Sequence, residues 1–594
     1  MSTSETMMYV WGTLPWRKLE RSVYRLQKRI YQASRQGNRE AVHKLQRLLV
    51  HSRSAVFIAV RRATQDNQGK KSAGVDGIAS LTNRQKYQLA MEIANRPLTD
   101  KAFPVRRVWI PKPGKDEKRP LGIPVMTDRA RQALAKMALE PEWEAKFEPD
   151  SYGFRPGRSC HDAVRTIYQN MFAEAKYVLD ADISGCFDHI NHKALLDKLD
   201  TFPALRRSIR AWLRAGISED GKLFPTTEGT PQGGIISPLL ANIALHGLAT
   251  KIENSFPKRK HPQGKKGPNL RWKPAVIRYA DDFVILHKDL NVLMEAQVIA
   301  KQWLANMGLD MKPSKTRITH TLKEVDGPIG FDFLGFNFRQ YPRGKSRCSR
   351  GPGGRQIGFS ANVKPSKDSQ KQFQLKIREV IRRHRNAPQI SLISALNRII
   401  RGWGNYFSAS VSGKIFSNMD NLIYEKLWAW AKYRHPNKSR GWIARKYWLL
   451  QSRGWRFGVR DNMTLLNLSE IPSRRHFPVR KHQSPYDGDV VYWSARLGRH
   501  PEMPRSYARL LKQQKGCCTI CGCFFKTGDT FQVLRSSEDK KSKTLRNAML
   551  IHKHCQRLPD AKCVLTKHRF IEEPYEGKPS RTVLKTSANR EVCA

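Results

Sequence analysis

The chain has 594 residues and carries 107 Lys and Arg against 51 Asp and Glu, a formal net charge of +56. Such an excess destabilises a compact chain unless a polyanion offsets it, and its spread along the whole length favours a nucleic-acid-binding protein over a solvated basic surface or a ribosome-associated protein. No apolar run approaches the roughly 18 residues of a membrane span, and residues 1–20 lack the apolar core of a signal peptide. We therefore expect no membrane partner, and a location in the bacterial cytoplasm or an organelle, not secretion.

The hydrophobic pattern predicts an α+β multidomain fold, with mixed elements first and helices later. In chain order it first predicts basic helices over 16–65, two short strands around a Gly/Lys-rich hairpin over 105–124, a helix over 127–145 and a buried strand over 177–183. A Pro/Gly/Lys-rich loop over 255–274 and a strand hairpin over 276–286 follow. The last part is predicted to contain helices over 362–435, a loosely built basic segment over 470–515 and a cysteine-rich region over 516–570.

Two adjacent carboxylates lie in the hairpin of 276–286, where Asp281 and Asp282 separate two short apolar strands. Neighbouring negative charges at a turn are costly unless a cation neutralises them, and Mg²⁺ prefers carboxylate oxygens. Asp182 ends the earlier buried strand. Nucleotidyl transfer uses two Mg²⁺ ions, which need carboxylates from two separate chain segments. The sequence predicts that these three aspartates hold the ions, because a chain short of acids places them at the ends of apolar strands.

Basic and glycine-rich segments accompany the aspartates. Lys112 and Arg119 lie on the Gly-rich hairpin of 105–124, where they are suited to clamp a triphosphate. The loop 151–158 is basic and aromatic, which suits a template backbone and base stacking. The glycines of 229–238, around Gln232, let the backbone approach nucleic acid closely.

A series of ordered blocks resembles the group II intron-encoded reverse transcriptase/maturases. The blocks are Arg107–Pro124, Ser151–His161, Leu179–His192, Gly229–Leu248, Val276–Leu286, Gly308–Thr316 and Phe331–Phe336. The resemblance implies that Asp182, Asp281 and Asp282 are the catalytic, metal-holding residues. It further implies that Lys112 and Arg119 contact the dNTP. By the same resemblance Phe187 lies beneath the sugar of the incoming nucleotide and excludes a 2′-hydroxyl, and Gln232 lies in the template–primer path. Lys315 belongs to the substrate-binding block after the hairpin of 276–286.

The helical part beyond residue 360 also resembles this family. Residues 396–407, 427–430 and 434–438 are similar to the maturase (X) domain, which acts as the polymerase thumb. The resemblance implies a right-hand polymerase with a basic helical N-terminal extension (1–100), fingers and palm of antiparallel sheet plus helices (101–345), an α-helical thumb/maturase domain (360–465), a basic DNA-binding linker (466–515) and a small, degenerate HNH-like zinc-binding domain (516–575). From the residues alone, Trp403 and Trp428 favour core packing over RNA contact, which falls to outward Arg and Lys.

Cys518-x-x-Cys521 and His552-x-x-Cys555 have the pair spacing of zinc ligands. The alternative is a set of buried free thiols. Ten cysteines, six of them between 517 and 563, fit a reduced compartment with one local metal site better than a secreted disulfide framework.

The cysteine region resembles the HNH endonuclease domain at the end of this family, which cuts one DNA strand to prime reverse transcription. That chemistry needs a histidine general base. No His occurs from 501 to 551, and Gln556 stands where the family has a His after the second pair, although Asn547 is kept. We expect a DNA-binding relic whose endonuclease activity is lost.

The sequence thus predicts an RNA-directed DNA polymerase of a group II intron that binds its intron RNA, assists splicing and supports mobility. The expected partners are the intron RNA, an RNA template with a DNA primer, target DNA and dNTPs, and the expected cofactors are two Mg²⁺ ions and structural Zn²⁺. A splicing-only maturase with an unused polymerase is the alternative, which the retained Asp182, Phe187 and Gln232 argue against. The absent histidine argues against a homing endonuclease.

Overall fold

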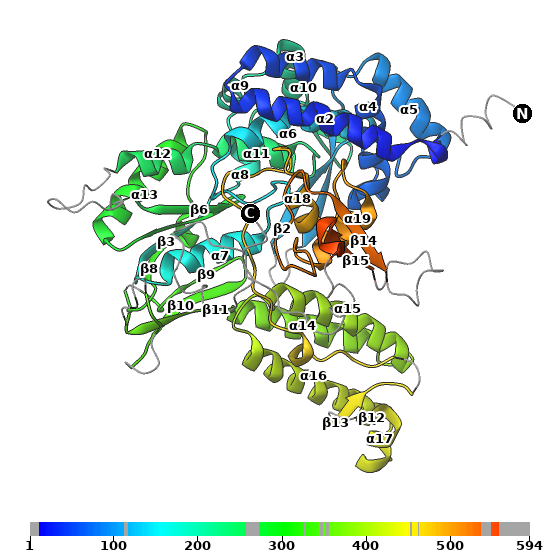
Figure 1. Ribbon diagram of the computed structural model, residues 1–594, viewed down its shortest axis with the longest axis vertical. Helices are drawn as coiled ribbons and strands as arrows, with labels where there is room; N and C mark the ends of the chain where they lie inside the picture. Colours follow the sequence, from blue (N-terminus) through cyan, green and yellow to red (C-terminus); the bar gives the residue numbers. More distant parts are fainter. Residues whose placement is uncertain are drawn as a thin grey trace, which may run out of the picture. The chain divides into compact units, whose positions relative to one another are not determined.

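The computed structural model describes residues 11–111, 117–256, 273–325, 327–344, 349–351, 354, 356–451, 454–460, 463–535 and 548–557. The chain divides into two compact units, Met1–Asp487 and Gly488–Ala594 (Figure 1). The loop predicted over 255–274 lies mostly outside the described residues.

The N-terminal helices of the first unit form because apolar residues recur at helical spacing. They are α2 (Trp16–Arg35), α3 (Arg39–Val50), α4 (Arg53–Arg61), a π turn (Arg62–Asp66), a 3-10 turn (Gln68–Lys71) and α5 (Asn83–Asn95). Val23, Ile30 and Leu49 belong to a buried core that includes α6 (Met126–Lys146). The helices predicted over 16–65 are confirmed. Arg residues four apart on α2 stay exposed on its other face, namely Arg17, Arg21, Arg25 and Arg29.

A four-stranded sheet follows, in the order β2-β1-β4-β5. Its strands are β1 (Val105–Pro111), β2 (Lys118–Ile123), β4 (Ile217–Glu219) and β5 (Lys222–Phe224), and β1 pairs antiparallel with β2 but parallel with β4. The predicted hairpin is therefore confirmed at its strands, while Lys112 lies outside the described residues. The helix predicted over 127–145 is present as α6.

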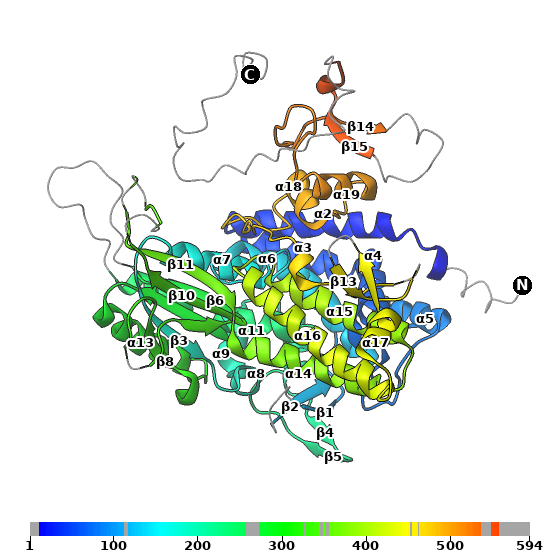
Figure 2. The same ribbon diagram turned by 90° about the horizontal axis from the view of Figure 1, so that it is seen from below.

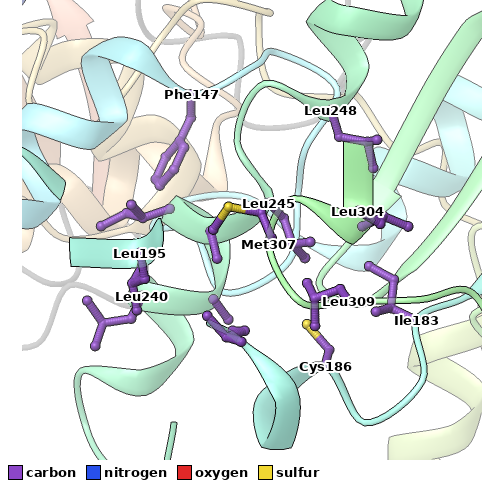
Figure 3. Close-up of a cluster of buried hydrophobic side chains, with 14 of the residues drawn as sticks. Phe147, Ile183, Cys186, Leu195, Leu240, Leu245, Leu248, Leu304, Met307 and Leu309 are labelled. Atoms are coloured by element: carbon purple, nitrogen blue, oxygen red, sulfur yellow. The ribbon is translucent and has the colours of Figure 1, made fainter. Parts of the chain in front are cut away.

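The second sheet is antiparallel, in the order β6-β7-β3-β8, and has a core on each face. Its strands are β3 (Tyr177–Asp182), β6 (Ala275–Tyr279), β7 (Asp282–His287) and β8 (Arg317–His320). Because side chains alternate along a strand, Leu179 joins one core and Val178 the other. Figure 3 shows the first core, in which Ile183 and Leu304 lie among residues of several helices.

The helices of this region border the two cores, and three of them make the main contacts with strands of the sheet. They are α7 (Cys160–Met171), α8 (Cys186–His189), α9 (His192–Leu199), α10 (Pro203–Leu213), α11 (Ser237–Leu245), α12 (Leu248–Ser255) and α13 (Leu290–Ala305). Helix α7 contributes to the second core, whereas α9 to α13 contribute to the first. The sheet thus has an apolar core on each face, and Asp182 and Asp282 lie at the ends of two of its strands.

A three-stranded sheet and a helical group complete the first unit. The sheet has the order β11-β10-β9, with β9 (Phe331–Phe333), β10 (Phe336–Pro342) and β11 (Phe359–Pro365). The helices are α14 (Lys367–Arg383), α15 (Gln389–Phe407), α16 (Gly413–Arg434) and α17 (Arg440–Tyr447), followed by the hairpin β12 (Trp448–Gln451) and β13 (Gly454–Phe457). Helices α14, α15 and α16 lie side by side (Figure 2). Trp403 stacks on Phe373 at 4.5 Å, and Trp428 also packs against the core, as predicted.

The second unit contains α18 (Val490–Leu497), α19 (Arg505–Gln513), β14 (Phe531–Arg535), β15 (Ala548–His552) and a 3-10 turn (His554–Arg557). The prediction of a loosely built segment over 470–515 is wrong for the two helices. Val491 and Leu511 pack with Leu550 and Ile551 in one core. The few apolar residues among many basic ones are enough to fold this segment because β15 supplies the other half of that core.

Candidate active site and metal-binding cluster

Three aspartates converge at one end of the antiparallel sheet. Asp182 and Asp282 are direct partners across β3 and β7. Asp281 lies in the turn before β7, where its carbonyl accepts a bond of 3.4 Å from Ile183 N. Burial raises the pKa of Asp281, and burial with the charges of Asp281 and Asp182 raises the pKa of Asp282 to about 7. Carboxylates held this close disfavour one another's ionised form, and a hard divalent cation, which prefers carboxylate oxygens, would relieve that repulsion.

Asp182 and Asp282 line a cavity of about 300 Å³, together with Asp180, Lys315, Arg317 and Leu334 among others. The Lys315 ammonium forms an ion pair with the Asp182 carboxylate. Asp180 lies two residues before Asp182 on the same strand face, and burial raises its pKa to about 6. Sequence reasoning missed Asp180, although the i, i+2 spacing of two acids on a strand is a usable signal. The donor set of carboxylate oxygens from two strands fits Mg²⁺ in chemistry, and Lys315 already provides one positive charge there.

A buried polar network holds the turn that carries Asp281. Arg278 is fully buried and donates to the Ala280 carbonyl at 3.0 Å and to Asn242 at 3.1 Å. Asn242 in turn donates to the Gly153 carbonyl at 2.7 Å. Ala280 has a φ of 59°, a left-handed conformation that is uncommon for a residue other than glycine. These contacts fix a strained turn, which is how a fold places a side chain accurately.

Sequence reasoning did not assign these supporting residues. A structural role for Arg278 could have been predicted from the sequence, because a charged side chain inside a buried apolar strand needs partners. The roles of Gly153 and Asn242 could not have been predicted, since they depend on a contact with a turn more than thirty residues away in the sequence.

Of the predicted substrate-binding residues, Lys315 lines the aspartate cavity, and Phe187, Gln232 and Arg119 lie on other segments of the first unit. Phe187 lies on α8, with its ring centroid 6.1 Å from that of Phe154 in an edge-on contact. The Gln232 side chain donates to Asp188 at 3.3 Å, and the backbone carbonyl of Gln232 accepts from Gly122 N at 2.6 Å, which anchors this residue to β2. Arg119 is exposed on β2, and its charge lowers the pKa of Asp281 against the larger effect of burial. Lys112 lies outside the described residues.

The four cysteine-region residues come together in the second unit. Ligand atoms of Cys518, Cys521, His552 and Cys555 all lie within 4.8 Å of one another. His552 Nδ1 is 3.4 Å from the Cys521 sulfur and 3.9 Å from the Cys555 sulfur. These separations suit the corners of a tetrahedron with bonds of roughly 2.1–2.3 Å. His552 Nε2 lies 3.2 Å from Asp529, a carboxylate that orients the ring as outer partners of metal-bound histidines do. The cluster could therefore hold a metal ion.

Three protein families match the chain. "Reverse transcriptase (RNA-dependent DNA polymerase)" matches residues 110–338, "N-terminal domain of reverse transcriptase" matches 11–93, and "Group II intron, maturase-specific domain" matches 370–448. Among curated relatives, Protein YkfC of Escherichia coli is 33% identical over 329 residues, covering 49% of this chain and 82% of YkfC. Group II intron-encoded protein LtrA of Lactococcus lactis is 26% identical over 571 residues, covering 83% of this chain and 90% of LtrA.

The chain belongs to the group II intron-encoded reverse transcriptase/maturases. Maturase-like protein 1 of Euglena gracilis is a more distant relative, 25% identical over 71% of this chain and 82% of that protein.

In this reverse transcriptase/maturase, the residues that match the reverse transcriptase family include all three aspartates. Membership of that family implies divalent metal ions at the polymerase site. The maturase-specific match covers most of α14 to α17 and implies binding of intron RNA. Within the described parts of the chain, no helix has both the length and the apolar character needed to cross a membrane.

Proposed function

We propose that this chain is an active RNA-directed DNA polymerase of a group II intron that also binds its intron RNA, assists splicing and supports mobility. The observation that carries the proposal is the meeting of three carboxylates, two at the ends of antiparallel strands and one in the turn before β7, beside the ammonium of Lys315. The proposed organisation is an N-terminal extension over 1–100, fingers and palm over 101–345, a thumb/maturase domain over 360–465, a DNA-binding linker over 466–515 and an HNH-like zinc domain over 516–575.

In the proposed reaction Asp182, Asp281 and Asp282 would hold two Mg²⁺ ions, which neutralise phosphate charge and favour the ionised primer 3′-hydroxyl. The other residues act through their own chemistry. The exposed guanidinium of Arg119 binds triphosphate oxygens, and Lys112 is assigned the same partner. Lys315 exchanges its Asp182 partner for a substrate oxygen, since an ammonium on a flexible stem can change partners at little cost.

Two residues select and align the substrate in this proposal. The Phe187 ring, wedged beside Phe154, leaves too little room for a 2′-hydroxyl on the incoming sugar. Gln232 presents its backbone to the template–primer, because Gly122 and Asp188 hold it in place.

Primer extension on an RNA template separates this proposal from a splicing-only maturase. Purified protein should extend a DNA primer with dNTPs in magnesium, and no extension from folded protein would remove the polymerase from the proposal. The Phe187→Ala variant should incorporate ribonucleotides more readily, because the side chain that contacts the 2′ position is gone. An unchanged rNTP/dNTP ratio would count against this role for Phe187.

Recognition of the intron is assigned to the basic helical parts on either side of the polymerase, residues 1–100 and 360–460. The exposed Arg stripe of α2 and the outward Lys and Arg of α14 to α17 supply phosphate contacts. Log affinity for intron RNA should fall with log salt by roughly 0.7–0.9 per phosphate contacted. A nearly flat salt dependence, or selective intron binding by residues 105–345 alone, would contradict this assignment.

The second unit is proposed to bind zinc and DNA without cutting DNA. The Cys521→Ser variant should lose the ion, about one per chain, that the tetrahedral set holds in the wild type. No histidine from 501 to 551 is available as a general base, so purified protein with intron RNA should not nick double-stranded target DNA. Mobility would then use a primer made elsewhere, such as a nascent strand at a replication fork. A site-specific nick that disappears when 516–570 are removed would overturn the proposed loss of endonuclease activity.

A further inference from the structure

A thiol and an imidazole lie side by side at the start of α7, outside the aspartate site. The sulfur of Cys160 is 3.6 Å from Nδ1 of His161. The other ring nitrogen, Nε2, is 2.7 Å from the backbone carbonyl oxygen of Tyr406 on α15. A carbonyl oxygen only accepts hydrogen bonds, so Nε2 carries the hydrogen of the neutral ring. Nδ1 therefore presents its lone pair to the Cys160 thiol and is placed to accept the thiol proton.

The surroundings favour the ionised pair. Burial raises the pKa of the Cys160 thiol, but its interactions with neighbouring groups, the hydrogen bond with His161 first among them, leave that pKa below its usual value. The hydrogen bond with Cys160 raises the pKa of His161. Cys160 also occupies the first turn of a twelve-residue helix, where the helix dipole stabilises a thiolate. Cys160 as a residue is half-buried, whereas Cys186 is buried.

Other ionisable groups near the pair do not draw the His161 ring away from the Cys160 thiol. The His476 ring lies 5.5 Å from that of His161, and its Nε2 is 3.1 Å from buried Asp162. Asp162 also accepts from the Val479 backbone, so this carboxylate is engaged by residues other than His161. Cys186 provides a contrast within the same unit, because burial raises the pKa of its thiol to about 12 and it has no such imidazole partner among its described contacts.

The pair is connected to the aspartate cavity through one side chain. Tyr406 accepts from His161 Nε2 through its backbone carbonyl, its ring centroid lies 5.1 Å from that of His161, and its hydroxyl donates to the Leu334 carbonyl at 2.9 Å. Leu334 lines the cavity that contains Asp182 and Asp282, and it has a φ of 49°, so its backbone is held in an unfavourable conformation. A change at Cys160 can therefore reach the carboxylate cavity through His161, Tyr406 and Leu334.

We propose that Cys160 and His161 form a peroxide-reactive thiol–imidazole site, and that oxidation of Cys160 stops DNA synthesis by displacing Tyr406 from Leu334. The Cys160 proton moves to His161 Nδ1. The sulfur then attacks one peroxide oxygen, the O–O bond breaks, and the departing hydroxide takes the proton from His161 to leave as water. Sulfur loses two electrons and the peroxide gains them, giving a sulfenic acid. An external thiol restores the cysteine through a mixed disulfide, which a second thiol molecule then reduces.

The test treats full-length protein with hydrogen peroxide, traps sulfenic acid with dimedone, maps the adduct by mass spectrometry and measures primer extension in parallel. Cys160 should gain the adduct at least about tenfold faster than Cys186, since reactivity follows thiolate character and exposure. Extension should fall in step with that adduct and return after dithiothreitol. The Cys160→Ser variant should extend normally and resist peroxide, and His161→Gln should slow adduct formation severalfold.

Three results would overturn the proposal. They are equal labelling of Cys160 and Cys186, full labelling of Cys160 with extension unchanged, and equal peroxide sensitivity of wild type and Cys160→Ser. The inhibitory effect rests on the proposed polymerase function, whereas the adduct map does not. Untreated protein that fails to extend a primer would therefore reject the polymerase, while the labelling rates would still decide whether the thiol–imidazole pair is reactive.

Discussion

The contact between Gly153 and the Asp281 turn gives a sharp test of how the carboxylates are positioned. A Cβ at residue 153 would lie 2.3 Å from Ala280 N and 2.9 Å from Ala280 Cα. Both atoms are backbone, so no side chain can rotate away. Restoring ordinary van der Waals separation requires the turn to move by about 1 Å. The perturbation is therefore one methyl group, and its effect falls on the residue next to Asp281.

A displacement of about 1 Å at a reacting centre lowers the rate by roughly 100-fold, and we expect that loss in kcat/KM for Gly153→Ala in primer extension. Gly402→Ala is the matched control, because a Cβ there meets nothing within 4 Å. Gly402 is exposed inside α15, where Ala is the better helix former by about 1 kcal/mol, so the control should extend normally. A folded Gly153→Ala variant with kcat/KM near that of the control would refute the reasoning.

Three further predictions concern the same region. Asp281→Ala should abolish cDNA synthesis while filter binding shows intron RNA affinity unchanged, because RNA binding is distributed over many Lys and Arg; equal loss of both in folded protein would contradict this. The pKa of Asp282 is raised to about 7, so below that pH a metal ion must displace a proton from this carboxyl group. The Mg²⁺ concentration for half-maximal extension should therefore rise as pH falls from about 8 to about 6. A Mg²⁺ requirement that stays constant over this range would argue against Asp282 as a ligand. Glu144→Gln should cost about 3–5 kcal/mol in denaturant unfolding, because it leaves buried Arg155 without its bidentate partner, whereas Asp200→Asn, at an exposed ion pair, should cost at most about 1 kcal/mol.

Strand and helix positions near the aspartates were predictable because they depend on local pattern. Alternating and continuous apolar runs identified β3, β6 and β7, and the same runs placed Asp182 and Asp282 at strand ends. The register that makes them direct partners was not predictable, since several pairings of two apolar strands bury similar area. The helices α18 and α19 were missed for a related reason. Their apolar residues are too few to indicate a core until β15 is placed against them.

The sequence by itself determined the polymerase family, the three aspartates and the two ligand pairs of the cysteine cluster, because residue type and spacing along the chain carry that information. The tertiary structure decided what positions them. Arg278, Asn242 and Gly153 support the Asp281 turn only because their segments meet in space. Likewise the tautomer of His161 is set by a carbonyl 245 residues further along the chain. Hydrogen bonds and close contacts act over a few ångströms, so their partners are known only once the fold brings distant segments together.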